Sequence, residues 1–597
     1  MKFSGRHLAV VTLASLLGII AFSLTAATRG QSSASGGKNF DGPAELPREY
    51  VKSSLKDTPA PGKTWMVRDG DNLQQVLGTA SCGDTIQLEA GATFSGNVVL
   101  PAKSCDDSHW IILRTSVPDS SLPSEGTRLT PCYAGVSSLA GRPRLNCSSA
   151  TNVLAKIEFH GSGGSGPVTF SSGANHYRLI GLEVTRTASP AAVYNLIEFS
   201  GPADHVVFDR VWLHGTAQDE SVRGIFLGQS RYVAVVDSFF TDFHCVSRSG
   251  ACGDTQAIFG GIGDGPMGPY KIVNNFLEAS GENILFGGGR GTASPQDIEV
   301  RHNHMFKPMT WMKGQPGYVG GRNGNPFVVK NLFELKNGQR VLLDGNILEN
   351  SWGGFSQVGF AILLTPKNPQ NCPVCQVTDV TIRYNSISHV GAGLQISNAL
   401  ADLKGAPLDG QRYSIHDIVI DDIDGAKYEG PGEFAQVSVS AGAPLLQNVQ
   451  INHVTAFPPQ MLLMMGAMVK ITNPMKNFVF TNSIVNAGTY PVWSTGGGTG
   501  NCAFHDNPVV SFNACFSSYT FASNAIIGAP PAYSQGSWPG KNFFPASSAA
   551  VRFVNYNSGI GGDYHLQPSS PYKNKGTDGK DLGADIDAIR SAIRGVE

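Results

Sequence analysis

The stretch Asn283-Ile284-Leu285-Phe286-Gly287-Gly288 decides the fold, because short runs of this kind return many times along the chain. Each run alternates apolar residues with others and closes on Gly, Ser, Asn or Pro. Successive residues of a strand point to opposite faces, so the pattern predicts short strands between tight turns. The related runs are Leu196–Gly201, Gly224–Gly228, Ala257–Gly261, Leu332–Asn337, Ile362–Thr365, Leu394–Ser397, Val437–Ser440 and Val469–Thr472.

A second kind of run lies between these and carries Asp or Asn at its turn. Such side chains bond backbone groups of neighbouring turns, and we expect this role here and for His302 and His304. A period of about 30 to 40 residues made of short strands is typical of a solenoid. The turn residues Asp209, Asp237, Asn275, Asn303, Asp344 and Asn385 are 28, 38, 28, 41 and 41 residues apart.

The composition agrees with one long solenoid. The chain has 597 residues, and such folds grow by stacking rather than by enlarging one globular core. Glycine is abundant (71 residues) and charged residues make up only 15%, which suits many turns and strands and argues against a helical protein. A formal net charge of −2 offers no basic surface, so a nucleic-acid partner is not expected.

The N-terminus has the layout of an export signal. Lys2 and Arg6 precede an apolar run from Leu8 to Leu24, which ends at the small residues Thr25-Ala26-Ala27. The alternative is an uncleaved membrane anchor, although 17 residues are few for a spanning helix. With either interpretation the bulk of the chain is extracytoplasmic, that is secreted, periplasmic or at the cell surface. No other segment is expected to cross a membrane.

The ten cysteines fall into five pairs of near neighbours. An even number of locally paired cysteines in an exported chain predicts disulfides that fasten loops. Cys372 and Cys375 also have the spacing of a redox or zinc pair, but no second pair of this spacing accompanies them. The candidate pairs are Cys82 with Cys105, Cys132 with Cys147, Cys245 with Cys252, Cys372 with Cys375, and Cys502 with Cys515.

The start of the solenoid carries a family resemblance. A short predicted helix over Leu73–Leu77 is followed by Gly83–Pro101, with the sequence GDTIQLEAGATFSGNVVLP. This order resembles the entry of a right-handed parallel β-helix of the pectin-lyase-like superfamily. The resemblance implies an all-β, single-stranded solenoid with an N-terminal capping helix, which acts on or binds polysaccharide as a monomer. A cap is also required physically, because the first coil would otherwise expose its core and an unpaired edge.

The predicted organisation follows from these features. Residues 1–27 form the signal or anchor, 28–60 a linker or extended arm, 61–150 the cap and first coils, 151–530 the β-helix core, and 531–597 a closing segment.

The resemblance does not extend to a catalytic signature. The chain lacks the Asn-Thr-Asp and Gly-His-Gly motifs of the related hydrolases. Val211-Trp212-Leu213-His214 is similar to the Val-Trp-Ile-Asp-His of pectate lyases but has no Asp, and Arg142-Pro143-Arg144 lies too early for their arginine motif. No active-site residue of the family can therefore be transferred to this chain.

Candidate site residues come instead from the outward positions of the first kind of run. Stacking predicts an outward row that is mostly apolar or small. The run with Glu334 and Lys336 is the exception, and it follows a long insertion that carries aromatic residues. A rigid floor with an aromatic loop beside it predicts a sugar-binding groove. The predicted row is Glu198, Phe226, Phe259, Leu285, Glu334, Leu363, Gln395, Ser438 and Lys470.

The leading chemistry is β-elimination on an acidic polysaccharide. A base removes the proton next to the substrate carboxylate, and a cation must neutralise that carboxylate. We expect Lys330 or Lys336 to be the base, with Glu334 and Arg322 in the catalytic group. The expected substrate-binding residues are Trp311, Tyr318, Asn283, Arg290 and Arg340, and the candidate Ca²⁺ ligands are Asp254, Glu278 and Glu282, joined by Glu334.

Two other functions remain open at this stage. Glu278, Glu282 and Glu334 offer the carboxylates that a glycoside hydrolase needs. The same lysines and glutamates can instead form solvated surface pairs on a non-catalytic β-helix that binds glycan or serves a structural role in the cell envelope.

Overall fold

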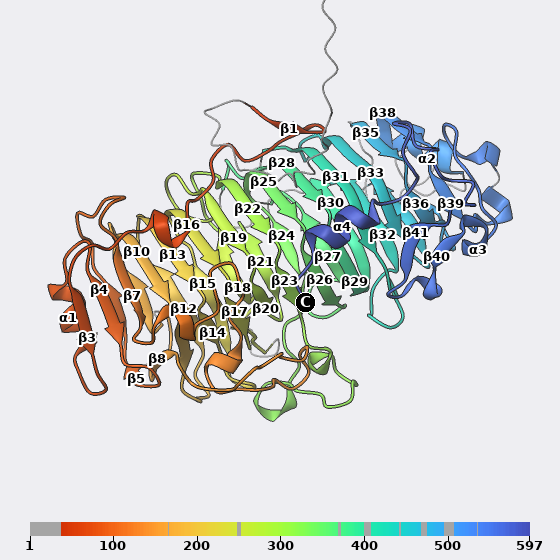
Figure 1. Ribbon diagram of the computed structural model, residues 1–597. Helices are drawn as coiled ribbons and strands as arrows, with labels where there is room; N and C mark the ends of the chain where they lie inside the picture. Colours follow the sequence, from red (N-terminus) through yellow and green to blue (C-terminus); the bar gives the residue numbers. More distant parts are fainter. Residues whose placement is uncertain are drawn as a thin grey trace, which may run out of the picture. The chain divides into compact units, whose positions relative to one another are not determined.

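The chain folds as a parallel β-helix, in which each turn of the solenoid adds one strand to each of three parallel ladders (Figure 1). The computed structural model describes residues 38–164, 166–246, 252–367, 372–398, 408–440, 443–466, 474–494, 507–533 and 535–597. The predicted signal or anchor (residues 1–27) lies outside these ranges. All described residues belong to one compact unit, Lys38–Glu597. The right-handed sense of the solenoid stays a prediction.

Ladder A runs the length of the solenoid, and each of its strands pairs in parallel with the equivalent strand of the next coil. Its strands are β3 (Thr64–Val67), β4 (Thr85–Leu88), β7 (Ile111–Thr115), β10 (Asn175–Ile180), β13 (Ala203–Asp209), β16 (Ser230–Val236), β19 (Tyr270–Val273), β22 (Gln296–Arg301), β25 (Gly338–Asp344), β28 (Val377–Arg383), β31 (Gly410–Ile420), β33 (Gln447–Ala456), β35 (Met475–Thr481) and β38 (Phe516–Ala522).

Ladder B lies around the corner from ladder A and merges with it through the long strands β31 and β33. Its own strands are β5 (Thr93–Ser95), β8 (Ala155–Phe159), β11 (Leu182–Arg186), β14 (Trp212–His214), β17 (Phe239–Thr241), β20 (Phe276–Glu278), β23 (His304–Phe306), β26 (Ile347–Ser351), β29 (Ser386–Val390), β36 (Ile484–Asn486) and β39 (Ala525–Ile527).

Ladder C is a separate twelve-stranded parallel sheet, and it contains the runs on which the sequence prediction rests. Its strands are β6 (Val98–Leu100), β9 (Val168–Phe170), β12 (Val193–Phe199), β15 (Ser221–Phe226), β18 (Gln256–Gly260), β21 (Glu282–Phe286), β24 (Phe333–Leu335), β27 (Phe360–Leu364), β30 (Ala392–Asn398), β32 (Glu433–Val439), β34 (Met461–Gly466) and β37 (Val492–Ser494).

Helices and two short antiparallel pairs complete the chain. α1 packs Leu73 and Leu77 into the core and contacts β3 and β6, the first strands of ladders A and C. The Asn72 side chain caps α1 by accepting from the Gln75 N–H. The remaining elements are α1 (Leu73–Thr79), α2 (Pro508–Cys515), α3 (Ser548–Val551), α4 (Ile586–Ala592), η1 (Leu55–Asp57), η2 (Asp119–Ser121), η3 (Pro131–Tyr133), η5 (Met309–Trp311), η6 (Arg322–Gly324), η7 (Pro531–Tyr533), η8 (Gln535–Ser537), η9 (Asn557–Gly559), β1 (Phe40–Asp41) with β2 (Ala44–Glu45), and β40 (Phe553–Asn555) with β41 (Asp563–Leu566).

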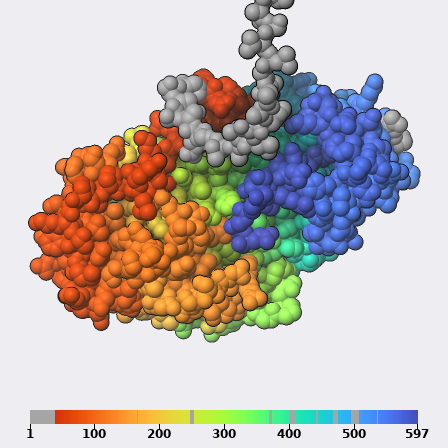
Figure 2. All heavy atoms as spheres, in the orientation of Figure 1, coloured from red at the N-terminus to blue at the C-terminus, as the bar shows by residue number. Residues whose placement is uncertain are grey.

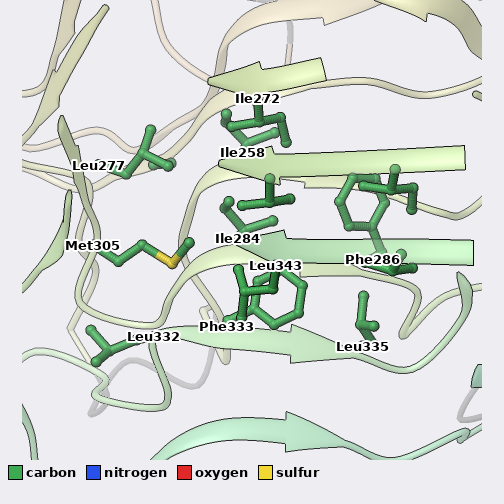
Figure 3. Packing of buried hydrophobic residues seen from close by; sticks show 14 of the residues in the cluster. Ile258, Ile272, Leu277, Ile284, Phe286, Met305, Leu332, Phe333, Leu335 and Leu343 are labelled. Atoms are coloured by element: carbon green, nitrogen blue, oxygen red, sulfur yellow. The ribbon is translucent and has the colours of Figure 1, made fainter. Parts of the chain in front are cut away.

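The core is a column of aliphatic and aromatic side chains between the three ladders. Ile258, Ile284 and Phe333 occupy the same position on β18, β21 and β24 and are completely buried (Figure 3). Leu277 and Met305 approach them from ladder B. Because equivalent side chains repeat in every coil, burial is continuous along the solenoid, which is what the alternation in the sequence predicts.

An asparagine ladder fills the corner between ladders A and B. The Asn303 side chain accepts from the Asn275 N–H, and that of Asn346 accepts from the Asn303 N–H, at 2.9 Å in both cases. Asn385 continues the series. The prediction placed Asp209, Asp237 and Asp344 in this series, and those three were wrong. Val211, Ser238 and Asn346 take the positions instead, and the amides of the ladder suit the buried corner because each both donates and accepts.

Segments from both ends of the chain lie across the coils. Residues 38–60, the N-terminal strap, run along the outer face of ladder A toward the start of the solenoid. The last residues lie against the middle of the unit, where the Arg128 guanidinium donates to the Val596 carbonyl at 2.7 Å (Figure 2). The strap contacts are Asp41 with Arg383 and His416, Glu45 N–H with Asp379, Arg48 N–H with Asp297, and the Ser53 carbonyl with Arg178.

Four of the five predicted disulfides are present. Cys82–Cys105, Cys132–Cys147, Cys245–Cys252 and Cys372–Cys375 are bonded. The fifth pair, Cys502 with Cys515, includes a residue outside the described ranges. Among the described residues, no helix is both long and apolar enough to cross a membrane.

The ion pair that fastens the strap predicts a pH dependence of stability. Burial favours neutral groups, but hydrogen bonds to Asp41 and Asp417 outweigh it and raise the pKa of His416 to about 9. Burial is likewise outweighed at Asp41, where His416 and Arg383 lower the pKa to about 2. The raised His416 pKa stabilises the fold fully below its unfolded value of about 6.5, and this stabilisation is lost as pH rises through about 9. The Asp41 contribution is lost as pH falls from about 4 through about 2.

We therefore expect Asp41→Asn to lower the free energy of unfolding by about 2 kcal/mol near neutral pH. Urea denaturation measures this change, and the loss of stability between about pH 7 and 10 should be smaller in the variant. Glu49→Gln, at a more exposed strap carboxylate, should change stability by less than about 0.5 kcal/mol. Equal effects of the two variants would contradict the role of Asp41.

Candidate functional site

The outer face of ladder C carries the predicted outward row. Pairing between coils aligns Glu198, Phe226, Phe259, Leu285, Glu334, Leu363 and Gln395 as expected. The next members are Gln436 and Met464. The prediction of Ser438 was wrong by two residues, because a strand can slip by two without exchanging its faces. The other predicted member, Lys470, lies outside the described residues.

A second outward row, missed by the sequence prediction, lies near the start of strands β12, β15, β18 and β21. Asn195, Arg223, Gln256 and Glu282 pair in register from coil to coil. Asn331 holds the equivalent place two residues before Phe333. Their side chains form a chain of contacts, in which Arg223 donates to Gln256 at 3.0 Å and Gln256 donates to Glu282 at 2.9 Å. Strict alternation hides this row, because two adjacent core residues, such as Leu332 and Phe333, separate its members from the first row. The adjacent apolar pair is the signal that could have revealed it.

Five charged residues gather where the two rows reach β21 and β24. We call Asp254, Glu282, Lys330, Glu334 and Lys336 the charge cluster. The Lys330 ammonium lies 3.2 Å from an Asp254 oxygen and 3.5 Å from a Glu282 oxygen. Lys336 lies 2.8 Å from Glu334. Of the residues predicted as catalytic, the structure thus brings Lys330, Glu334 and Lys336 together.

Accessibility differs sharply within the charge cluster. The Glu282 side chain is completely buried and that of Glu334 is 1% exposed. Lys330 and Lys336 are 10% and 14% exposed, whereas Asp254 is 29% exposed. Asp254 is therefore the carboxyl of the cluster that a bound molecule reaches most easily.

The charge cluster separates the pKa values of its carboxyl groups. Burial and the adjacent Glu282 charge raise the pKa of Asp254 well above its ordinary value. Burial also raises the pKa of Glu334. At Glu282 burial acts in the same direction, but the Lys330 ammonium and a hydrogen bond with Asp254 outweigh it and hold the pKa well below the usual range. The cluster thus places a carboxyl of lowered pKa directly beside a carboxyl of raised pKa.

The two lysines of the charge cluster are firmly protonated. Burial alone would lower the pKa of Lys330, but the charges of Glu282 and Asp254 outweigh it and raise the pKa. Glu334 raises the pKa of Lys336 against burial in the same way. A lysine base needs a lowered pKa. The electrostatics therefore favour these lysines as cations that attract a carboxylate.

Lys307, which the sequence prediction did not include, has the opposite property. Burial lowers the pKa of Lys307 to about 7. Its ammonium donates to the Asn283 side chain at 3.1 Å and to the Asn331 carbonyl at 2.8 Å. Asn331 in turn donates to Glu334 at 2.6 Å. Because Lys307 is completely buried, it supports the charge cluster from beneath.

The three predicted Ca²⁺ ligands do not form one site. Glu278 lies on ladder B, where Arg142 binds both its oxygens at 2.7 and 2.8 Å. Asp254 and Glu282 remain together, with the Lys330 ammonium against both. Ca²⁺ takes six to eight oxygen ligands, and this donor set does not fit that demand.

The aromatic wall of the predicted groove is absent from the described residues. Trp311 is 2% exposed and packs edge-on against His244 and Phe327, with the Arg142 guanidinium 5.4 Å from its ring. Trp311 thus stabilises the insertion and was wrongly predicted to contact substrate. Tyr318 is half-buried, and its hydroxyl lies 3.4 Å from the Gly324 carbonyl.

The other predicted substrate-binding residues are dispersed. Asn283 is buried and donates to two backbone carbonyls. Arg340 lies on ladder A, where it binds Asp297. Arg290 is exposed and 3.5 Å from Asp264. Asn283 lies on β21 beneath the charge cluster and Arg340 lies on another ladder, so neither is placed to contact a substrate on the outer face of ladder C. The role of Arg290 stays a prediction.

Arg322 lines a separate polar cavity. Its guanidinium is half exposed and pairs with Asp219. The cavity has a volume of about 340 Å³ and is also lined by Glu220, at the start of β15, and by Val246. The predicted catalytic arginine thus stands beside a pocket rather than in the charge cluster.

Comparison with known proteins identifies solved structures that are similar to this chain. Similar solved structures include an alginate lyase from Paenibacillus sp. str. FPU-7 (12% identity, 73% of this chain and 98% of that chain, TM-score 0.31). A PL6 family polysaccharide lyase from Pseudopedobacter saltans is also similar (11% identity, 80% of this chain and 95% of that chain, TM-score 0.37). So is a family 28 exopolygalacturonase from Yersinia enterocolitica (12% identity, 78% of this chain and 79% of that chain, TM-score 0.37). No protein-family model and no curated protein matches the chain.

The chain is a parallel β-helix protein. The strand register establishes this.

Charge compensation in the charge cluster predicts a large cost for removing its central cation. In Lys330→Met, the buried Glu282 and the neighbouring Asp254 lose their counter-charge. We expect the free energy of unfolding to fall by about 3–5 kcal/mol near neutral pH, measured by urea denaturation. The deficit should shrink near pH 4, where more carboxyl groups are neutral. Lys313→Met, at an exposed lysine of the insertion, should cost less than about 0.5 kcal/mol. A Lys330 variant as stable as this control would refute the compensation.

Proposed function

We propose that this protein is an extracytoplasmic enzyme that cleaves an acidic polysaccharide by β-elimination at the charge cluster. One observation carries the proposal. On an outer face that is otherwise mostly apolar or amide-bearing, the partly exposed Lys330 ammonium contacts the partly exposed Asp254 carboxyl of raised pKa, and a second ammonium, that of Lys336, belongs to the same cluster. The four disulfides support an oxidising location outside the cytoplasm.

The lysines supply the electrostatic part of the reaction. A uronate sugar carries a carboxylate next to the carbon that loses its proton. Lys330 and Lys336 attract this carboxylate and stabilise the negative charge that develops on it in the transition state. Their raised pKa values suit this role, because both remain cationic at neutral pH.

Asp254 carries the proton in this proposal. Its ionised form takes the proton from C5 of the uronate, the electrons of that bond form the C4–C5 double bond, and the C4–O4 bond breaks. The same carboxyl then returns the proton to the departing O4 oxygen. A raised pKa suits a carboxyl group that must both accept and donate a proton. Glu282, which is buried, keeps that pKa high.

A second function is favoured by the same contacts. Every member of the charge cluster already has a partner of opposite charge, which suits a surface that binds an acidic glycan without cleaving it. The hydrolase alternative has less support, because Glu278 is apart from the other two carboxylates and Glu282 is buried.

The enzyme proposal predicts a loss of activity on neutralising one carboxyl. The tag-free chain is incubated with a panel of uronate polymers, and the unsaturated product is followed by its ultraviolet absorbance. Asp254→Asn should lower the rate by about 10²-fold or more while polymer binding persists. Asp264→Asn, an exposed carboxyl outside the cluster, should retain full activity.

Affinity electrophoresis of the same proteins in gels that contain the polymers separates the alternatives. If the polymer retards the protein in the gel but no unsaturated product forms, the protein binds the polysaccharide without cleaving it. Neither retardation nor product on any acidic polymer would reject both functions.

A further inference from the structure

Two histidines and an aspartate gather on the outer face of ladder A, far along the sequence from the charge cluster. His176 is on β10 and His205 is on β13, the next strand of the ladder. Both have positive φ values, 55° and 53°, so the two rings leave the backbone in the same direction. Asp107 faces them from the loop before β7. One potential ligand atom from each residue lies within 4.8 Å of the others.

In each histidine ring the Nδ1 atom contacts an oxygen, so the Nε2 atom is the one that could bind a metal ion. The Asn175 side-chain oxygen lies 2.9 Å from Nδ1 of His176, and Asp204 lies 2.6 Å from Nδ1 of His205. Asn175 and Asp204 are themselves paired in register on β10 and β13. An oxygen acceptor at Nδ1 places the proton there when the ring is neutral, which is the arrangement that accompanies metal-bound histidines. Nε2 of His176 lies 3.2 Å from an Asp107 oxygen, so a metal ion would take the place of that contact between two of its own ligands.

Neighbouring aromatic rings pack against the pair. The His176 and His205 rings are stacked, with centroids 4.5 Å apart and planes 3° from parallel. Tyr232 stacks on the far side of His205, and Trp110 meets His176 edge-on. The Cys82–Cys105 disulfide fastens the loop two residues before Asp107. The group is thus built by three separate parts of the chain that the fold brings together.

From this geometry we propose that Asp107, His176 and His205 bind a borderline divalent metal ion of the Zn²⁺ type. Two imidazole nitrogens and a carboxylate are the three-ligand set of many zinc sites, with a fourth position open to water. A coordinated metal lies in the plane of each ring, so binding turns the rings out of their parallel stack. His205 is 31% and Asp107 is 86% exposed, which leaves both free to make this adjustment.

The bound ion would join the loop before β7 to the coils of β10 and β13. This function is independent of the proposed elimination. Among the described residues, no other group of three His, Cys, Asp or Glu side chains meets the same distance limit.

Zinc binding by the full chain tests this site. The tag-free protein is dialysed against a chelator and titrated with ZnCl₂ by calorimetry, and retained zinc is counted by atomic emission. We expect one Zn²⁺ per chain. His205→Ala and Asp107→Asn should each weaken binding by about tenfold or more. His109→Ala removes a nearby exposed histidine that pairs with Asp106, and it should leave the affinity unchanged.

Circular dichroism of the metal-free variants keeps the test interpretable, because Asp107 is too exposed for its loss to unfold the protein. Absence of stoichiometric zinc in the parent chain would overturn the proposal. Equal affinity in the parent and in both ligand variants would overturn it as well.

Discussion

Parallel pairing in register determines which side chains stand next to one another along this solenoid. Equivalent side chains of successive coils stand about 4.8 Å apart, directly above one another. Inside, this spacing lets Ile258, Ile284 and Phe333 form a continuous column. Outside, it forbids rows of like charge unless each charge meets an opposite one. The outer rows therefore consist of amides, apolar residues or compensated charges.

The charge cluster is one solution to this constraint. Arg223, Gln256 and Glu282 alternate cation, amide and anion along one row, and Lys330 balances the anions at its end. The same closeness separates the protonation states, since neighbouring carboxyl groups cannot all ionise. A structural demand for compensation thus creates a partly exposed carboxyl with altered acidity. The residues of the charge cluster thus both stabilise the fold and supply the proposed chemistry.

The sequence predicted the fold well because the fold is periodic. Alternation placed the inward residues and most of the outward row, and cysteine spacing gave four disulfides. The prediction of the outward row failed where the repeat in the sequence does not specify which residues of neighbouring coils pair. Slippage by two residues at Gln436 keeps the alternation intact, so only coil-to-coil pairing reveals it.

The sequence predicted part of the charge cluster for a related reason. Lys330, Glu334 and Lys336 were found because they interrupt the repeat. Glu278 and Arg340 were misplaced, because proximity in sequence does not show which ladder a residue joins. Trp311 was misjudged because the sequence does not show whether an aromatic side chain in an insertion packs inward or faces a ligand. Lys307 was missed, since nothing in the sequence distinguishes a buried lysine from an exposed one.

The N-terminal strap changes how the solenoid behaves as a whole. In a simple stack each coil contacts only its neighbours, and segments can open independently. The strap instead joins Asp41 at the coil of His416 to Ser53 at the coil of Arg178. Coils separated by more than two hundred residues of sequence thereby share one tether. Local opening anywhere beneath it must loosen contacts on both sides, so the central coils respond to heat or force as a single body.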